Sequence, residues 1–186
     1  MEGDLEKETM PTLNYKMIET PEEFEELVRR IEKQDAVAFD VEADSMFHFR
    51  EKVCLIQMAV EDRSYVIDPF KIEDLSPLKG PFGDPAIQKI FHGADYDIRS
   101  LYRDYGIVIK NLFDTQLASR FIGAKCTGLE AVVQKRFDVR LNKKYQKKDW
   151  SERPLPEKMI EYAARDAIYL KPLAEILQRE DRKSVV

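Results

Sequence analysis

The chain has 186 residues, which is enough for one domain that buries about two-thirds of its unfolded surface without disulfides or a structural metal. Its composition, with 44% hydrophobic and 35% charged residues, is typical of a globular domain and excludes wholesale disorder. No apolar run reaches the roughly 18 residues of a membrane-spanning helix, and a net charge of −5 argues against a simple basic nucleic-acid-binding protein.

The N-terminal residues and the cysteines indicate how the chain is organised. We expect residues 1–12 to form a flexible acidic arm, since they lack the apolar stretch of a secretory signal, and residues 13–182 to form a single domain. Only two cysteines occur, Cys54 in the apolar run VCLIQMAV and Cys126, so a disulfide scaffold and a cysteine zinc site are excluded. A buried free thiol at Cys54 and a cytoplasmic location are the corresponding expectations.

The first half of the chain predicts one helix followed by strands. Thr20 can cap a helix that has Pro21 at its first position and Glu23 in a capping box. Strands are then expected at 36–42, 53–60 and 64–68. The last two strands are expected to form an antiparallel hairpin, and residues 76–85 to form a loop with one helical turn.

In the second half, strands and helices alternate before helices predominate. The expected elements are strands at 88–92 and 111–114 and helices at 95–105, 115–122, 128–137 and 156–179. Asp95 is placed to cap the helix at 95–105, Thr127 and Glu130 to form a capping box, and Pro172 to break the last helix. This order predicts an α/β fold with a mixed central β-sheet flanked by α-helices.

Two pairs of polar residues occur on predicted elements that are otherwise largely apolar. Asp40 and Glu42 share one face of the strand at 36–42, roughly 7 Å apart, and hard divalent cations would relieve their repulsion. Tyr162 and Asp166 share one face of the last helix. Each pair alone is better explained by solvated residues at the surface. A third acidic site, Asp95 or Asp97, falls where a strand passes into a helix, and periodicity does not choose between the two.

Four segments of the chain, which together span about residues 36–175, resemble ribonuclease D and related 3′→5′ exonucleases, a family that includes the proofreading domains of DNA polymerases. These segments are FDVEADS, HGADYDIRSLYRDYGI, NLFDTQLASR and WSERPLPEKMIEYAARDAIYL. The resemblance implies a ribonuclease H-like fold and a signature of four carboxylates with one tyrosine, carried here by Asp40, Glu42, Asp97, Asp166 and Tyr162.

Details of the motifs refine this resemblance. The pair Tyr96-Asp97 matches the middle motif and favours Asp97 over Asp95. The sister subfamily has a histidine where this chain has Glu161, so the chain resembles the tyrosine type. Val41 stands where ribonuclease D usually has threonine, which weakens the match to ribonuclease D itself. Full ribonuclease D also carries C-terminal helical nucleic-acid-binding domains, and this chain ends after the exonuclease domain.

The resemblance implies hydrolysis of a phosphodiester with two Mg²⁺ or Mn²⁺ ions about 4 Å apart. Asp40 would bridge both ions, Glu42 and Asp166 would complete the first site, Asp97 would support the second, and Tyr162 would orient the attacking water. The expected substrate is a single-stranded 3′ end of RNA, in tRNA or other stable-RNA maturation or in decay, and the product is a nucleoside 5′-monophosphate. The chain is expected to act as a monomer.

Other functions remain open from the sequence alone. A DNA 3′→5′ exonuclease would have the same fold and chemistry, because discrimination of the 2′-hydroxyl is a matter of site geometry. A non-catalytic nucleic-acid-binding or scaffold domain is the alternative from a different class, although all four carboxylates and the tyrosine are present. For a small-molecule phosphohydrolase with a carboxylate metal site, the sequence gives no indication of a substrate pocket.

Four further side chains are candidates for binding the substrate. By the resemblance, Met46 would wedge against the terminal base and His92 would touch the terminal nucleotide. Trp150 could stack on a base and Arg153 could contact a phosphate. The alternatives are a core or loop hydrophobe for Met46, a structural histidine for His92, and packing onto the last helix for Trp150. A basic run before Trp150 is either a solvated loop or a phosphate-tracking surface, and its lysines are Lys143, Lys144, Lys147 and Lys148.

The net negative charge is not spread evenly along the chain. Residues 1–35 contain eleven acidic and five basic residues, a net charge of −6, so the remainder carries +1. Two bound divalent cations would make that remainder more positive still. The acidic balance therefore belongs to the N-terminal part and does not exclude a nucleic-acid substrate.

Overall fold

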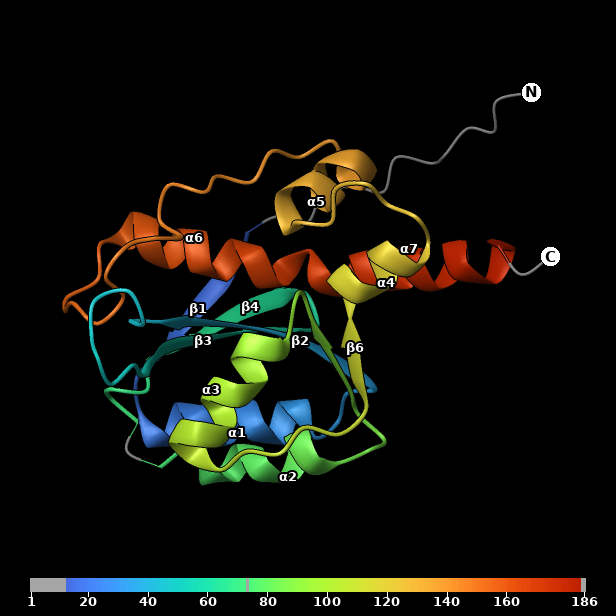
Figure 1. Cartoon of the computed structure of the whole chain (residues 1–186). Helices are drawn as coiled ribbons and strands as arrows, with labels where there is room; N and C mark the ends of the chain where they lie inside the picture. Colours follow the sequence, from blue (N-terminus) through green and yellow to red (C-terminus); the bar gives the residue numbers. More distant parts are fainter. Residues whose placement is uncertain (1–12, 73, 185–186) are drawn as a thin grey trace.

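The computed structural model describes residues 13–72 and 74–184, so the arm predicted over residues 1–12 lies outside the described residues. Figure 1 shows a mixed sheet in the strand order β1-β4-β3-β2-β5-β6, which confirms the predicted fold class. Its strands are β1 (Tyr15–Ile18), β2 (Ala36–Ala43), β3 (Val53–Val60), β4 (Arg63–Ile67), β5 (Gln88–Phe91) and β6 (Leu112–Asp114).

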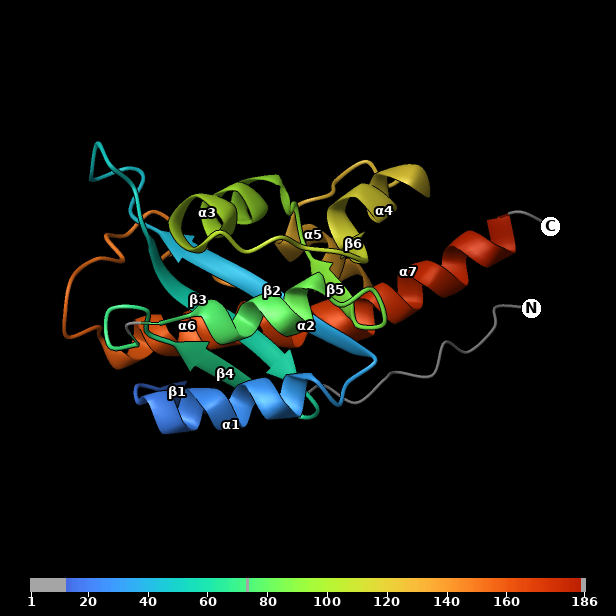
Figure 2. The same cartoon turned by 90° about the horizontal axis from the view of Figure 1, so that it is seen from below.

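Helices cover both faces of this sheet. They are α1 (Pro21–Ile31), α2 (Lys79–Gly83) after a 3₁₀ turn (Ser76–Leu78), α3 (Asp95–Tyr105), α4 (Thr115–Phe121), α5 (Leu129–Phe137), α6 (Glu157–Ile168) and α7 (Leu170–Ser184). The views in Figures 1 and 2 place α1, α2 and α3 on one face and α6 and α7 across the other. Within the described residues, no helix has the length and apolar character needed to cross a membrane.

The central strand β2 separates two cores by its side-chain alternation, as predicted. Val37, Phe39 and Val41 are buried on the face covered by α1, α2 and α3, where the Phe39 ring lies 4.2 Å from that of Phe82. Ala38 is buried on the other face, against Ala167 and neighbouring residues of α6 and α7. Because residues two apart share a face, Asp40 and Glu42 lie on the α6 side of the sheet.

The predicted hairpin is confirmed, and one strand was missed. β3 and β4 pair antiparallel around a tight turn in which Glu61 has a positive φ of 55°. The unpredicted β1 pairs in parallel with β4, in the register Tyr15↔Ser64 to Ile18↔Ile67. Its sequence YKMI is too short for periodicity to mark it, so pairing with the sheet edge determines its conformation.

Of the three residues predicted to cap helix N-termini, one does so in the structure and two do not. The Thr20 hydroxyl accepts a hydrogen bond from the Glu23 N–H at 3.3 Å, as expected for the α1 cap. Asp95 is not a cap, because the cap residue of α3 is Ala94 and the exposed Asp95 pairs with Arg99. Thr127 does not cap α5 either, since that helix follows Gly128 without a side-chain cap.

The expected break in the last helix is confirmed and lies just before Pro172. The helical stretch divides at Tyr169, between the end of α6 and the start of α7. Pro172 has no N–H to donate to the carbonyl of Ile168, which accounts for the position of the break. The loop predicted at 76–85 contains the 3₁₀ turn and the short helix α2.

Candidate active site

Three acidic side chains from two elements meet above the end of β2. Carboxylate oxygens of Asp40, Glu42 and Asp166 all lie within 4.8 Å of one another. The strand pairing shifts register between Glu42 and Ala43, an irregularity of the kind that redirects side chains at active sites. The structure therefore brings together two acidic motifs that lie far apart in the sequence.

Small residues allow α6 to deliver Asp166 to this position. Ala163, Ala164 and Ala167 are fully buried, with exposed fractions of 0%. Alanines on the inner face let the helix backbone approach the sheet closely, and residues 162 and 166 then project from the same face toward β2.

Asp97 approaches the cluster from the opposite side of the sheet edge. It lies in the first turn of α3 and is buried, although it is not among the three carboxylates that meet within 4.8 Å. The loop before it contains Gly93, which has a φ of 75° that favours glycine. Asp114 fixes this loop by accepting hydrogen bonds from the N–H groups of Gly93 and Ala94 at 2.9 and 3.0 Å.

Asp114 is a supporting residue that the sequence motifs did not single out. Besides holding the loop before α3, its carboxylate caps α4 by accepting from the N–H of Gln116 at 2.8 Å. These backbone hydrogen bonds lower its pKa, although its burial acts in the opposite direction. An Asp-Thr pair just before a helix is the sequence signal for such a cap.

Asp97 is buried and the other three predicted carboxylates are partly buried, and none of the four forms a salt bridge within the described residues. Burial raises the pKa of Asp40 to about 7. Burial and mutual repulsion raise the pKa values of the other three well above their usual range; these are Glu42, Asp97 and Asp166. A buried set of oxygen ligands with like charges fits a divalent metal, because the ion supplies the missing positive charge.

Tyr162 completes the cluster from α6. Its hydroxyl lies beside Asp166, and burial and the nearby carboxylates raise its pKa above the usual value. Its ring packs between those of Tyr145 and Trp150, at centroid distances of 5.8 and 6.1 Å. The group is therefore a fixed, protonated hydroxyl, which suits orientation of a water better than abstraction of a proton.

A pocket of about 380 Å³ opens over the cluster and could hold a terminal nucleotide. Asp40, Glu42, Tyr162 and Asp166 line it, and so does His92. The His92 ring is hydrogen-bonded through Nδ1 to the Thr115 hydroxyl at 2.9 Å, and burial lowers its pKa, so it enters the pocket as a neutral ring.

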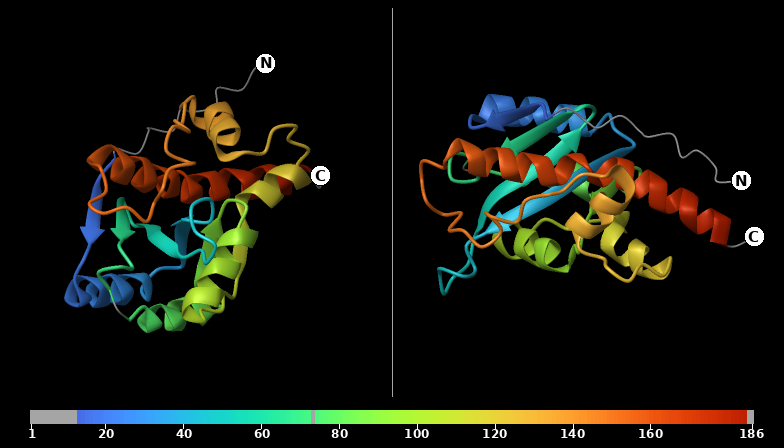
Figure 3. Two further views of the ribbon diagram at one scale, coloured as in Figure 1. Left: turned by 60° about the vertical axis from the view of Figure 1, so that its left-hand side comes forward. Right: turned by 90° about the horizontal axis from the view of Figure 1, so that it is seen from above.

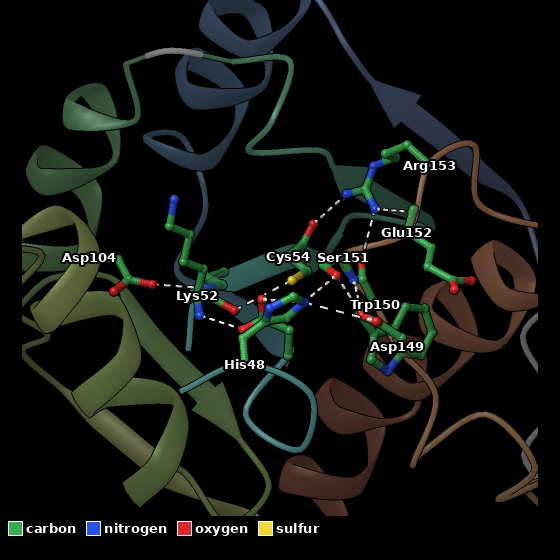
Figure 4. Close-up of polar contacts among 11 residues, drawn as sticks. His48, Lys52, Cys54, Asp104, Asp149, Trp150, Ser151, Glu152 and Arg153 are labelled. Carbon is green, nitrogen blue, oxygen red and sulfur yellow. Dashed lines mark hydrogen bonds and ion pairs between the residues drawn. The ribbon is translucent and has the colours of Figure 1, made fainter. Parts of the chain in front are cut away.

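Met46 lies outside that pocket, on the loop between β2 and β3. Its side chain is 66% exposed, and Phe47 and Phe49 on the same loop are exposed as well. Figure 4 shows a contact between this loop and the segment before α6, in which Nε2 of the His48 ring lies 3.1 Å from the Ser151 hydroxyl oxygen. A contact between Met46 and a terminal base stays a prediction.

Trp150 and Arg153 were predicted to touch the substrate, and the structure places both in structural roles. Trp150 is only 1% exposed and packs under Tyr162, so it offers no free face to a base. The Arg153 guanidinium donates to both carboxylate oxygens of Asp68 at 2.8 and 2.9 Å. Its other three N–H groups donate to the carbonyls of Cys54, Trp150 and Glu152, as Figure 4 shows. These contacts leave it no donor for a phosphate.

Gln57 is a second buried polar residue that the sequence motifs did not single out. It pairs with Asp40 across β2 and β3 and has an exposed fraction of 0%. Neither its amide nitrogen nor its amide oxygen has a hydrogen-bond partner within the part of the chain that the structure describes. The signal in the sequence is one polar residue inside the apolar run VCLIQMAV, at the position facing Asp40.

Comparison with known proteins agrees with this geometry. A family model described as 3′-5′ exonuclease matches residues 15–181. The chain belongs to this 3′-5′ exonuclease family. Protein RRP6-like 2 of Arabidopsis thaliana is 37% identical over 168 residues, covering 89% of this chain and 19% of that protein. The chain thus spans about a fifth of the length of the curated relatives it matches.

Solved structures of the 3′-5′ exonuclease family confirm the ribonuclease D-like, ribonuclease H-like fold. Escherichia coli RNase D, an exoribonuclease involved in structured RNA processing, superimposes with a TM-score of 0.85 at 33% identity, covering 92% of this chain and 46% of that one. Brucella melitensis NrnC with bound Mg²⁺ gives a TM-score of 0.77 at 25% identity, covering 93% of this chain and 83% of that one.

Proposed function

We propose that the protein is a metal-dependent 3′→5′ exonuclease that hydrolyses RNA from its 3′ end. The observation that carries the proposal is the meeting of Asp40, Glu42 and Asp166 within 4.8 Å, with Tyr162 lining the same pocket. Membership of the 3′-5′ exonuclease family and the likeness to RNase D support it.

The carboxylates would hold two divalent cations, Mg²⁺ or Mn²⁺, as NrnC holds Mg²⁺. Asp40, Glu42 and Asp166 form one ligand set, and Asp97 would support the second position. When bound, the two ions supply charge stabilisation for the attacking and leaving oxygens of a phosphodiester. Desolvation and mutual repulsion, which raise the pKa values of these carboxyl groups, are the physical reason why the cluster favours cations over its metal-free state.

The rest of the chemistry follows from the protein's own groups. Tyr162 would orient a water for attack on the terminal phosphodiester, since the packing of its ring against Tyr145 and Trp150 fixes its position. The water oxygen adds to phosphorus, and the bond from phosphorus to the O3′ of the preceding nucleotide breaks. The products are a nucleoside 5′-monophosphate and a strand with a new 3′-hydroxyl.

RNA is preferred over DNA in this proposal because RNase D, one of the structures most like this chain, is an exoribonuclease. Maturation or decay of tRNA and other stable RNA is the corresponding role. Action as a monomer in the cytoplasm remains a prediction. A DNA exonuclease with the same site is the second candidate. A non-catalytic binding domain is disfavoured because the full set of carboxylates and Tyr162 is present and assembled.

The test compares single-stranded RNA and DNA of one sequence, each labelled at the 5′ end, in Mg²⁺, in Mn²⁺ and in EDTA. We expect the RNA to shorten one nucleotide at a time in either metal, faster than the DNA, and to stay intact in EDTA. A circular RNA of the same sequence is the control, since an exonuclease leaves it uncut. Cleavage of the circle, or cleavage of linear RNA in EDTA, would contradict the proposal.

A further inference from the structure

A second pocket, of about 400 Å³, adjoins the one over the carboxylates. The two share part of their lining, namely Asn142, Tyr162 and Asp166. The remaining walls come from α6 and from the segment that follows α5. In Figures 1 and 3 this segment runs back over α6 before it descends toward residue 150.

The lining of this second pocket is strongly basic. Arg140 and Lys144 come from the segment after α5, whereas Lys158 and Arg165 come from α6. Lys158 and Arg165 are seven residues apart, so they lie two helical turns from one another on one face. All four side chains are exposed, and the acidic residues beside them are Glu161 and Asp166. Asp166 is itself a proposed metal ligand, so its charge would be neutralised when metal binds.

These four cations differ from many others on the molecule because none of them forms a salt bridge among the described residues. By contrast, Arg29 and Arg30 on α1 are each paired with a glutamate one turn away. Four cations beside only two acidic residues leave an excess of positive charge in the pocket lining, and a bound anion offsets that excess. The pocket therefore fits an anionic ligand.

We propose that this basic pocket binds a backbone phosphate of the nucleic-acid strand, next to the phosphate being cleaved; this rests on the proposed exonuclease function. An occupant that reaches across the shared wall of Tyr162 and Asp166 needs one phosphate for the carboxylate cluster and another for the cations. A strand carries linked phosphates, whereas a released mononucleotide carries a single one. The adjoining positions of the two pockets thus favour the strand over the product.

Two double variants test the two walls of the pocket. One combines Lys158→Gln with Arg165→Gln on α6, and the other combines Arg140→Gln with Lys144→Gln on the segment after α5. The matched control is Arg29→Gln with Lys33→Gln, which removes the same charge from α1 and the turn after it, on the other face of the sheet. The first measurement is binding of a fluorescent single-stranded RNA in EDTA over a range of salt concentrations. For each pocket variant we expect weaker binding and a shallower plot of log affinity against log salt. The slope should decrease by about 0.7 for each phosphate that the variant no longer neutralises.

The second measurement compares kcat/KM for that RNA with kcat/KM for the p-nitrophenyl ester of a nucleoside 5′-monophosphate, which has no neighbouring phosphate. Because the charge of Arg165 partly offsets the rise in the pKa of Asp166, the ester reports any effect on the carboxylate cluster itself. We expect the pocket variants to lose more of the RNA value than of the ester value, and the control to retain both.

The outcomes separate this proposal from the proposed function. If the wild-type protein hydrolyses neither RNA nor the ester in Mg²⁺ or Mn²⁺, the exonuclease proposal fails, while RNA binding in EDTA still tests the pocket. A salt dependence equal to that of the wild type in both pocket variants would overturn the pocket. So would a result in which only inhibition by a free nucleoside 5′-monophosphate weakens, because the pocket would then hold product.

Discussion

Asp40 is a residue whose surroundings oppose its own charge. It lies partly buried at the end of a core strand, and desolvation there raises its pKa to about 7. Glu42 and Asp166 lie within 4.8 Å of it. Such an arrangement destabilises the metal-free protein when the carboxyls ionise, because desolvated like charges repel. Bound cations should therefore stabilise the folded protein, whereas the ionised carboxylates destabilise it when no metal is bound.

A dependence of stability on pH follows from these raised pKa values. Between about pH 4, where an unfolded aspartate titrates, and about pH 7, where Asp40 titrates in the folded protein, the folded state binds more protons than the unfolded state. Stability in EDTA should therefore fall as pH rises through this window, measured as a lower Tm at pH 7.5 than at pH 5.5. Saturating Mg²⁺ should raise the Tm at pH 7.5.

The variant Asp40→Asn provides the control for this pH effect, since an amide cannot ionise. Its Tm in EDTA should fall less between pH 5.5 and pH 7.5 than that of the wild type. An equal fall in both proteins would show that the carboxylate cluster is not the source of the dependence.

At the scale of single residues, the sequence predicts which residue types form the candidate site better than it predicts the packing around them. Alternation along one strand correctly placed Asp40 and Glu42 on one face, and the resemblance chose Asp97 over Asp95. The same resemblance predicted that Trp150 and Arg153 contact the substrate. In the structure Trp150 packs under Tyr162, and Arg153 is bonded to Asp68. A motif gives the residue types near a site, but burial depends on contacts made by distant parts of the chain.

At the scale of elements, the segment 141–156 is joined to the sheet by a buried ionic contact. Arg153 in this segment bonds both oxygens of Asp68, which follows β4 and is 2% exposed. The same guanidinium donates to the carbonyls of Cys54 in β3 and of Trp150. Arg153 therefore acts as a positioning residue that holds Trp150 beneath the Tyr162 ring.

Removal of that contact should be costly. We expect Arg153→Gln to lower the free energy of unfolding by about 3 kcal/mol, because it leaves the buried Asp68 carboxylate without its counter-charge. Urea unfolding gives the measurement, and Arg29→Gln on the exposed face of α1 is the matched control, with a change within about 0.5 kcal/mol. A decrease for Arg153→Gln no larger than that of the control would refute the structural role of Arg153.

Elements with strong periodicity were predictable, and elements defined by their neighbours were not. The amphipathic helix α1, with Phe24, Leu27, Val28 and Ile31 buried, follows directly from its sequence. β1 has four residues and exists because the edge of β4 accepts it in parallel. The caps of α3 and α5 were misplaced because Asp114, 20 residues away, holds the backbone at Ala94, and Gly128 begins α5 without a side chain.

At the scale of the whole molecule, charge is divided between the two faces of the sheet. The acidic helix α1 lies on the face opposite α6, whereas both pockets of the proposed nuclease lie on the α6 side. A net charge of −5 for the chain thus conceals a basic pocket beside a cluster of metal-binding type. Charge counted over a sequence predicts the partner poorly when the fold separates acidic from basic surfaces.

The most direct test of the central claim is product release from 5′-labelled single-stranded RNA in Mg²⁺ by the wild type and by Asp40→Asn. We expect the wild type to release nucleoside 5′-monophosphates one at a time from the 3′ end. Asp40→Asn should keep the wild-type circular dichroism spectrum and lose at least roughly a thousandfold in rate, because one of the carboxylates that would hold the metal is gone. Release of monophosphates by Asp40→Asn at the wild-type rate would contradict the proposed mechanism.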